Sequence, residues 1–445
     1  MRCLFCVSAV IAALGQLACS SSNDATSAPT MPTPFANPPS SSSPTPTAAE
    51  GATPDPAAPS DGSSTNTGNG ANGSANDGEK LPTAVAPSAP TDTSAGAGSP
   101  TPPTSTPPAD GTTPPSDTTT PPTPPTQPAV VVKSGLPEPG SGGVAQPAGN
   151  PTNFKVLNWA GFKAAVSYTF DDTNATQIQH YTELNGLGVP LSFYLITNKT
   201  TEINNPVWAQ ALKDGHELGN HTQSHQQTGT DAALAADTDA GQQFLENKFG
   251  IKVYTMAAPY GAAPYTNIAR SRYLINRGTG DAQIGPNDNT DAFNLSCFIP
   301  PMGAATSVFN GKVDAVRASG KWQVMLVHGF LNNGQAVNGE YQPVDINQFT
   351  AGVRYAKSLG DVWIDSVVTV GAYWIGQKLV SGIKPTQGAD GSTWSWTLPN
   401  HFPPGKFLRV TVDGGTLTQK GQPLAWDDHG FYEVALDAGS VTLSN

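Results

Sequence analysis

Acidic and histidine side chains occur in three short segments whose residue types and spacing suit hydrolysis at a metal ion. Residues 169–172 read Thr-Phe-Asp-Asp, residues 221–225 read His-Thr-Gln-Ser-His, and residues 326–328 read Leu-Val-His. One carboxylate with two imidazoles is the ligand set of an open catalytic zinc site. A second carboxylate and a third histidine then remain for proton transfer. The three segments together predict metal-assisted hydrolysis.

Each segment taken alone has a simpler explanation. His221 and His225 are four residues apart, so on one helical turn both rings would face one metal, but such pairs are often only solvated. Adjacent acids such as Asp171 and Asp172 also cap helices, and His328 alone fits a buried, hydrogen-bonded histidine. Their joint occurrence, each at or just after the end of a predicted strand, favours a shared site.

The elements that would position these residues alternate between strands and helices. Predicted strands span 164–170, 189–196, 215–220, 253–258, 322–327 and 362–370. Predicted helices span 176–187, 207–213, 234–249, 268–276, 346–359 and 372–378. This alternation indicates an α/β fold, a parallel sheet with helices packed outside it. Reactive residues of such folds lie at the carboxyl ends of the strands, where these segments fall.

After about residue 385 the pattern changes to short strand-like runs separated by Gly and Asp turns. Residues 384–445 therefore predict a small antiparallel β module behind a catalytic domain of residues 151–383. Trp394, Trp396 and Trp426 would form either a sugar-stacking face or part of the core of this module, and core packing is the favoured interpretation.

The N-terminal third has the features of an exported protein. Residues 1–19 resemble a bacterial lipoprotein signal, with Cys19 as the residue that would carry lipid. Residues 20–150 are rich in Pro, Thr, Ser, Ala and Gly and predict a disordered linker. The expected location is therefore the cell envelope, through a lipid anchor, or otherwise the secreted fraction. Cys297, the cysteine that remains, predicts a buried structural thiol.

Charge excludes one class of partner. The formal net charge is -12 and the pI is near 4.9, and no basic stripe interrupts the acidic character. Nucleic acid is therefore not an expected partner, and the expected contact with a membrane is only through the lipid anchor.

The segment from 164 to 377 resembles the polysaccharide deacetylase (NodB-homology) family, carbohydrate esterase family four. Its first motif corresponds to residues 169–172, its second to residues 221–225, and its fifth to residues 326–328. The end of the third motif corresponds to Pro-Tyr-Gly at 259–261. The resemblance implies a distorted (β/α) barrel and a hydrolase that removes acetyl groups from a polysaccharide.

The family's roles carry over to the residues that match its motifs. By this resemblance, Asp172, His221 and His225 would bind a divalent metal, most simply Zn²⁺. Asp171 would be the catalytic base that takes a proton from the attacking water. His328 would be the acid that protonates the leaving amine or alcohol. The substrate would be an acetylated amino-sugar polymer such as chitin or peptidoglycan, or an O-acetylated polysaccharide such as acetylxylan.

Further roles concern the acetyl group and the support of the base. The resemblance implies that the backbone N–H of Tyr260 stabilises the oxyanion and that Leu326 and Pro259 line the acetyl pocket. The family's third motif usually begins with an arginine that orients the base, but Ala257 occupies that position here. Arg277 is a candidate substitute from the next strand end, although a surface arginine is an equally good interpretation.

A second departure motivates a competing hypothesis. The family's fourth motif, an aspartate–tryptophan element that helps position the histidine acid, is not recognisable, and the nearby candidates are Asp281, Asp288 and Asp291. The alternative to a deacetylase is therefore a surface protein that keeps the fold, binds carbohydrate and is catalytically impaired. The complete metal set and both proton-transfer residues favour the enzyme.

Overall fold

The computed structural model of this protein describes residues 134–337 and 339–445. The predicted signal at 1–19, lipidation at Cys19 and the linker up to residue 133 lie outside the described residues and stay predictions. Residues 134–150 differ from the predicted disordered linker, because they are an extended segment that is hydrogen-bonded to the C-terminal β module. Among these bonds, the Gly149 N–H donates to the Asp413 carbonyl at 3.0 Å.

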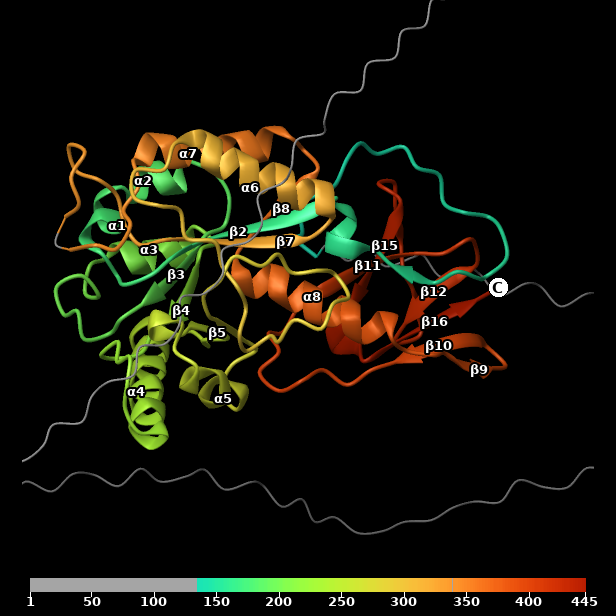
Figure 1. The fold of residues 1–445 in the computed structure, drawn as a ribbon. Coiled ribbons are helices and arrows are strands. Elements are labelled where there is room, and N and C mark those ends of the chain that lie inside the picture. The colour runs from blue at the N-terminus through green and yellow to red at the C-terminus, as the bar shows by residue number, and fades with distance from the viewer. Residues whose placement is uncertain (1–133, 338) are drawn as a thin grey trace, which may run out of the picture. The chain divides into compact units, whose positions relative to one another are not determined.

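A seven-stranded parallel sheet forms the centre of the α/β domain (Figure 1). Its order is β6-β5-β4-β3-β2-β7, and β8 pairs with the amino-terminal half of β2. The strands are β2 (Ala164–Phe170), β3 (Ser192–Leu195), β4 (Glu217–Asn220), β5 (Thr255–Ala257), β6 (Ile275–Arg277), β7 (Trp322–Val327) and β8 (Val362–Ile364). Every residue of β2 is buried, which is typical of a parallel strand covered on both faces. The α/β fold expected from the sequence is confirmed.

The two faces of the sheet are covered differently. Alternate residues of β2, among them Tyr168 and Phe170, join an apolar cluster with most of the helices. Those helices are α1 (Ala175–Gln179), α2 (Tyr181–Asn185), α3 (Val207–Lys213), α4 (Asp231–Phe249), α5 (Pro264–Arg270), α6 (Thr306–Ser319) and α7 (Ile346–Ser358). The opposite face packs on α8 (Val367–Ser381) and, through it, on the β module. None of the described helices has the length and apolar character that crossing a membrane requires.

Several predicted elements differ from the observed ones. The predicted helix 268–276 is wrong, because α5 starts earlier, with Pro264 in its first turn, and residues 275–277 form β6. The predicted strand 362–370 ends at residue 364, and Ser366 caps α8 by accepting from the Thr369 N–H. Helix α8 begins with Val-Val-Thr-Val at residues 367–370, a composition typical of a strand. These residues are helical because α8 has a largely buried surface, where packing overrides propensity. Helix α6 was not predicted.

The β module consists of two small antiparallel sheets. One sheet has the order β1-β11-β15-β14 and the other β13-β12-β16-β10-β9. The strands are β1 (Lys155–Val156), β9 (Thr386–Gly388), β10 (Gly391–Ser395), β11 (Phe407–Thr411), β12 (Thr416–Gln419), β13 (Gln422–Pro423), β14 (Trp426–Asp427), β15 (Phe431–Ala435) and β16 (Ser440–Ser444). Because β1 precedes the α/β domain, the module draws on chain segments from both sides of that domain.

Interior packing accounts for two tryptophans of the module. Trp394 and Trp396 are buried, Trp394 stacks on Phe154 at 4.2 Å between ring centroids, and the Trp396 indole N–H donates to the Leu436 carbonyl at 2.7 Å. Core packing is therefore confirmed for these two rings. Arg409, also buried, donates to the carbonyls of Pro137 at 2.6 Å and Ala160 at 3.1 Å, which joins the module to the preceding chain.

Candidate active site

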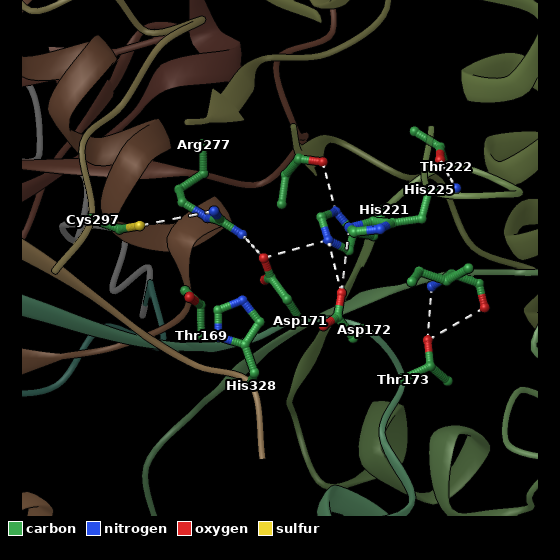
Figure 2. Close-up of polar contacts among 12 residues, drawn as sticks. Thr169, Asp171, Asp172, Thr173, His221, Thr222, His225, Arg277, Cys297 and His328 are labelled. Atoms are coloured by element: carbon green, nitrogen blue, oxygen red, sulfur yellow. Dashed lines mark hydrogen bonds and ion pairs between the residues drawn. The ribbon is translucent and has the colours of Figure 1, made fainter. Parts of the chain in front are cut away.

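The predicted catalytic and metal-binding residues converge at the carboxyl ends of the parallel strands (Figure 2). They line a cavity of about 530 Å³, whose walls are formed by Asp171, Asp172, His221, His225, Gln227, Ala258, Tyr260, Gly261, Arg277, Thr279, Ile299, Leu326, His328 and Tyr341. Leu326 is thus at the cavity wall, whereas Pro259 is buried and is not among the lining residues. Residues distant in sequence meet here because neighbouring parallel strands all end at this edge.

Asp172, His221 and His225 form a group that fits a divalent metal ion. The Nε2 atoms of His221 and His225 lie 3.4 and 3.5 Å from the same carboxylate oxygen, Asp172 Oδ1. One ligand atom from each of the three residues lies within 4.8 Å of the others. Asp172 Oδ1 is buried and accepts no hydrogen bond from the described residues, which is costly unless an ion or a proton occupies it. Two imidazoles and one carboxylate are the donor set of a catalytic zinc site.

Hydrogen bonding selects the tautomer of His221 that can bind a metal. Its Nδ1 lies 2.8 Å from the carbonyl oxygen of Ala257. Because a carbonyl can only accept, Nδ1 carries the proton and the lone pair of Nε2 points toward Asp172. Ala257 therefore contributes its backbone carbonyl to the site. Its side chain cannot orient the base as the arginine of the family's third motif does.

Charges set the protonation of this group. Burial would raise the pKa of Asp172, but the neighbouring His221, together with charge effects of His328 and His225, holds that pKa well below its usual range. Burial opposes protonation of His221, but the carboxylates of Asp171 and Asp172 outweigh burial and raise its pKa. Burial and the nearby His221 lower the pKa of His225 to about 4. His225 is therefore neutral near pH 7, as a metal ligand must be.

The two histidine ligands meet through a loop rather than through the helical turn that their spacing suggested. Thr222 and His225 have φ values of 65° and 57°, in the left-handed region. The Thr222 side chain accepts from the His225 N–H at 3.0 Å. On the outer side, the Ser224 hydroxyl donates to Asp237 of α4 at 2.6 Å. Helix α4 thus holds the loop in the conformation that turns both rings inward (Figure 2).

The turn that follows β2 is also strained. Asp172 and Thr173 have φ values of 75° and 56°, and each non-glycine residue in this region costs about 1 kcal/mol. Thr173 offsets part of this cost, because its side chain accepts from the Ile196 N–H at 2.7 Å. The turn presents Asp171 and Asp172 side by side at the cavity (Figure 2).

Arg277 is the partner of the predicted base. Its guanidinium donates to Asp171 Oδ2, and both side chains are almost fully buried. The arginine also donates to the Gly278 carbonyl at 2.9 Å and lies against the free, buried thiol of Cys297. Burial opposes the charge of Arg277, but the Asp171 carboxylate outweighs it and raises the arginine pKa. A surface location for Arg277 is excluded by this burial.

His328 is positioned through its backbone. The side-chain amides of Asn174 and Gln177 each donate to the His328 carbonyl at 2.7 Å, and Gln177 also donates to the Asp171 carbonyl. The ring atom His328 Nδ1 is buried and has no hydrogen-bond partner among the described residues. Burial lowers the pKa of His328.

The acidic candidates for the missing fourth motif are bonded elsewhere. Asp281 pairs with Lys312, Asp291 pairs with Arg270, and Asp288 accepts from the Gly285 and Thr290 backbone N–H groups. They therefore do not contact His328 in this structure. The ring of Tyr341, instead, lies edge-on to the His328 ring at 5.2 Å between centroids.

Tyr260 also lines the cavity. Its φ of 55° is left-handed, and its ring lies 4.5 Å from that of His225. Tyr260, together with Asp172, Thr173, Thr222 and His225, makes the site the main concentration of left-handed non-glycine residues described in the chain. Such concentrations mark positions that the surrounding structure over-determines.

Sequence reasoning missed three residues that contact the catalytic segments. Asn174 and Gln177 follow Asp172 by two and five residues, so their proximity to Asp171 could be expected from the sequence, but their contact with His328 could not. Tyr341 lies 13 residues beyond His328 in a loop, and no periodic pattern could have placed its ring.

Comparison with known proteins shows a family similarity over part of the α/β domain. Residues 161–274 match the family model described as polysaccharide deacetylase. Gellan lyase from a Bacillus species is 29% identical over 145 residues, which is 32% of this chain but only 6% of that curated relative. A match over so small a part of gellan lyase does not carry its activity to this chain.

Solved structures with similarity to this chain include two carbohydrate esterases. The Xyl-CE4 domain of a multidomain xylanase from the hindgut metagenome of Trinervitermes trinervoides is 17% identical, covers 46% of this chain and 88% of that chain, and has a TM-score of 0.33. The family 4 carbohydrate esterase from Streptomyces lividans is also 17% identical, covers 46% and 92%, and has a TM-score of 0.32.

Residues 161–274 are therefore similar to the polysaccharide deacetylase family, and the matched motifs extend this similarity to His328.

Proposed function

We propose that this protein is a metal-dependent hydrolase that removes acetyl groups from a polysaccharide and is exported, with a lipid anchor at Cys19. The observation that carries the proposal is the proximity of Asp172, His221 and His225 to a buried Asp171–Arg277 pair and to His328. A metal set beside two proton-transfer groups is the arrangement that acyl hydrolysis requires.

The residues divide the chemistry between them. A divalent ion held by the two histidines and Asp172 would acidify water and polarise an acyl carbonyl. Asp171, kept in place by Arg277, accepts the proton of the attacking water. His328 donates a proton to the leaving nitrogen or oxygen, which an amine requires more than an alkoxide does.

The oxyanion and the acetyl methyl have their own partners. The Tyr260 N–H is the candidate donor to the oxyanion, and such a donor typically lowers the barrier by about 3 kcal/mol. Leu326, at the cavity wall, offers an apolar contact to the methyl group. These roles serve N-acetyl and O-acetyl substrates alike, because attack and oxyanion are the same in both.

One observation favours the competing function. His328 Nδ1 lacks a hydrogen-bond partner among the described residues, and an acid whose ring is not oriented would be a poor catalyst. A protein of this kind would bind an acetylated glycan at the same cavity without hydrolysing it.

Acetate release separates the two functions. The full-length protein is incubated with acetylated chitooligosaccharides, peptidoglycan fragments and acetylxylan, with Zn²⁺ and after chelation. The proposal predicts acetate from at least one substrate and none after chelation. Glycan binding with no acetate from any of them would favour the impaired binding protein.

A further inference from the structure

Exposed apolar side chains gather around the active-site cavity. Tyr260 and Tyr341, each 58% exposed, both line it. Met302 is 60% exposed and lies in a segment that neighbours the Tyr341 loop. The Gly303 N–H, next to Met302, donates at 3.0 Å to the carbonyl of Pro343, which is two residues after Tyr341. Val144 is the other large hydrophobic residue exposed in the described chain, and it is not among the residues that line the cavity. Exposed apolar groups concentrated in this way mark a surface that binds something.

Each of the two tyrosines lies beside a different histidine of the site. Tyr260 lies beside the metal-ligand candidate His225, with rings 4.5 Å apart and tilted by 42°. Tyr341 lies beside the acid candidate His328, with rings 5.2 Å apart and nearly perpendicular, at 89°. One exposed ring therefore adjoins a metal-ligand candidate and the other adjoins the acid candidate.

The loop that carries Tyr341 is anchored next to that ring. Thr176 donates to the carboxylate of the adjacent Glu340 at 2.8 Å, and the same hydroxyl accepts from the Phe330 N–H at 3.0 Å. The carboxylate lies so close to Gly329 that any Cβ there would collide with it. An anchored ring loses less conformational entropy on binding than a ring on a free loop does.

The charges of the cavity restrict the ligand. The acidic and basic side chains that line it are Asp171, Asp172, Arg277 and the three histidines already assigned to catalysis. Arg277 is occupied by Asp171, so within the described lining no lysine or arginine remains to pair with a carboxylate or phosphate of the ligand. Uncharged sugar rings, by contrast, present apolar faces that pack on aromatic side chains.

We propose that Tyr341 and Tyr260 stack on the sugar units that flank the deacetylated unit of an uncharged, acetylated glycan chain. This inference rests on the proposed function and narrows its substrate class to neutral polysaccharides bound over several units. Acetylated amino-sugar and acetylated xylose chains share this chemistry, and anionic polymers do not. Contact with Tyr341 would raise kcat/KM on a glycan chain but not on a small acetyl ester, which is too short to reach a flanking unit.

The test compares chain substrates with a small ester in full-length variants. The kcat/KM values are measured on neutral acetylated chitooligosaccharides and xylooligosaccharides of increasing length, on an acetylated anionic polymer and on 4-nitrophenyl acetate. In the unaltered protein, kcat/KM on one of the neutral series should increase with length up to several units. In Tyr341→Ala the ratio of kcat/KM on the long oligosaccharide to that on the ester should fall about tenfold, the value of one aromatic contact.

Matched variants keep the test specific. Tyr341→Phe retains the ring and should keep the ratio, as should Val144→Ala, which removes an exposed apolar side chain that does not line the cavity. Tyr341→Gln keeps an exposed polar group and should behave like Tyr341→Ala. Equal losses on ester and oligosaccharide, an unchanged ratio, or a preference for an anionic polymer would overturn the inference. Absence of acetate from every substrate would instead overturn the proposed function beneath it.

Discussion

Ala257 and Arg277 are paired residues at the ends of two adjacent parallel strands, β5 and β6. Ala257 holds the place where the family's third motif has an arginine, and Arg277, one strand away at the same level, donates to Asp171. The Ala257 side chain is small, and its carbonyl accepts from His221. The guanidinium therefore reaches the predicted base from the neighbouring strand, and the base keeps the support that the sequence alone left in doubt.

Arg277→Ala should impair catalysis and stability together. Removing one partner of a buried ion pair leaves Asp171 uncompensated and should destabilise the fold by roughly 3 kcal/mol. The kcat of the folded protein should fall about 100-fold, since the base loses its orientation. Kinetics on folded protein and thermal denaturation measure the two effects.

The strand pairing offers a matched rescue of this variant. In Ala257→Arg/Arg277→Ala the guanidinium returns to the position usual in the family, with space vacated on β6, and should restore part of kcat. Arg277→Ala with unaltered kcat would show that Asp171 does not depend on this arginine.

Metal binding should depend on His221 and not on a second group of similar composition. Glu138, which is exposed, and the half-buried Asp427 and His429 also place potential ligand atoms within 4.8 Å of one another. His221→Ala should lose both the bound Zn²⁺ and acetate release, whereas His429→Ala should retain both.

Zinc at 1,000 times its Kd should stabilise the unaltered protein by about 4 kcal/mol. Elemental analysis and melting curves with and without chelator provide the measurement, and a His221→Ala protein that keeps its metal would refute the assigned ligands.

Gln177 should act by positioning the base and the acid together. Its amide donates to the backbone carbonyls of both Asp171 and His328, so it fixes the ends of β2 and β7 relative to each other. Gln177→Leu should lower kcat about tenfold, the value of roughly one hydrogen bond, with little change in KM or zinc content. Gln177→Glu, which cannot donate when ionised, should lower kcat further. A rise in KM at constant kcat would instead indicate a role in binding.

Glu217 should make stability depend on pH away from the active site. Its carboxylate accepts from Ser192 at 2.7 Å and from the Val368 N–H at the start of α8 at 3.0 Å. Burial raises its pKa, although its hydrogen bonds and, to a smaller extent, Lys406 oppose this shift. Because the folded state holds this proton more tightly, the stabilisation is complete below the unfolded pKa near 4.5 and is lost as pH rises through the folded value.

Glu217→Gln isolates this contribution. The variant should melt above the unaltered protein at pH 7, by about 2–4 °C for each kcal/mol, and the gap should close toward pH 4. Melting temperatures between pH 4 and 8 provide the comparison. The nearby Asp365, whose pKa burial also raises, remains in both proteins and cancels from the difference. A gap independent of pH would show that Glu217 does not carry the effect.

The sequence predicted the strands that carry the site better than the contacts within it. The predicted bounds of β2 and β7 match the observed strands, because long buried runs that end at reactive residues are distinctive. The loop from His221 to His225 was read as helical, since a four-residue spacing does not reveal left-handed φ values. The contact of Arg277 with Asp171 joins residues 106 positions apart and depends on strand order, which no local pattern contains.

Acetate release by Asp171→Asn tests the central claim most directly. The substitution keeps the shape of the side chain but removes the proton acceptor that Arg277 holds, and it leaves Asp172, His221 and His225 in place. The substrate is the neutral oligosaccharide on which the unaltered protein is active, and both proteins carry the same amount of Zn²⁺. Under these conditions Asp171→Asn should release acetate at least about 100-fold more slowly than the unaltered protein. Equal rates in the two proteins at equal zinc content would contradict the assignment of Asp171 as the base.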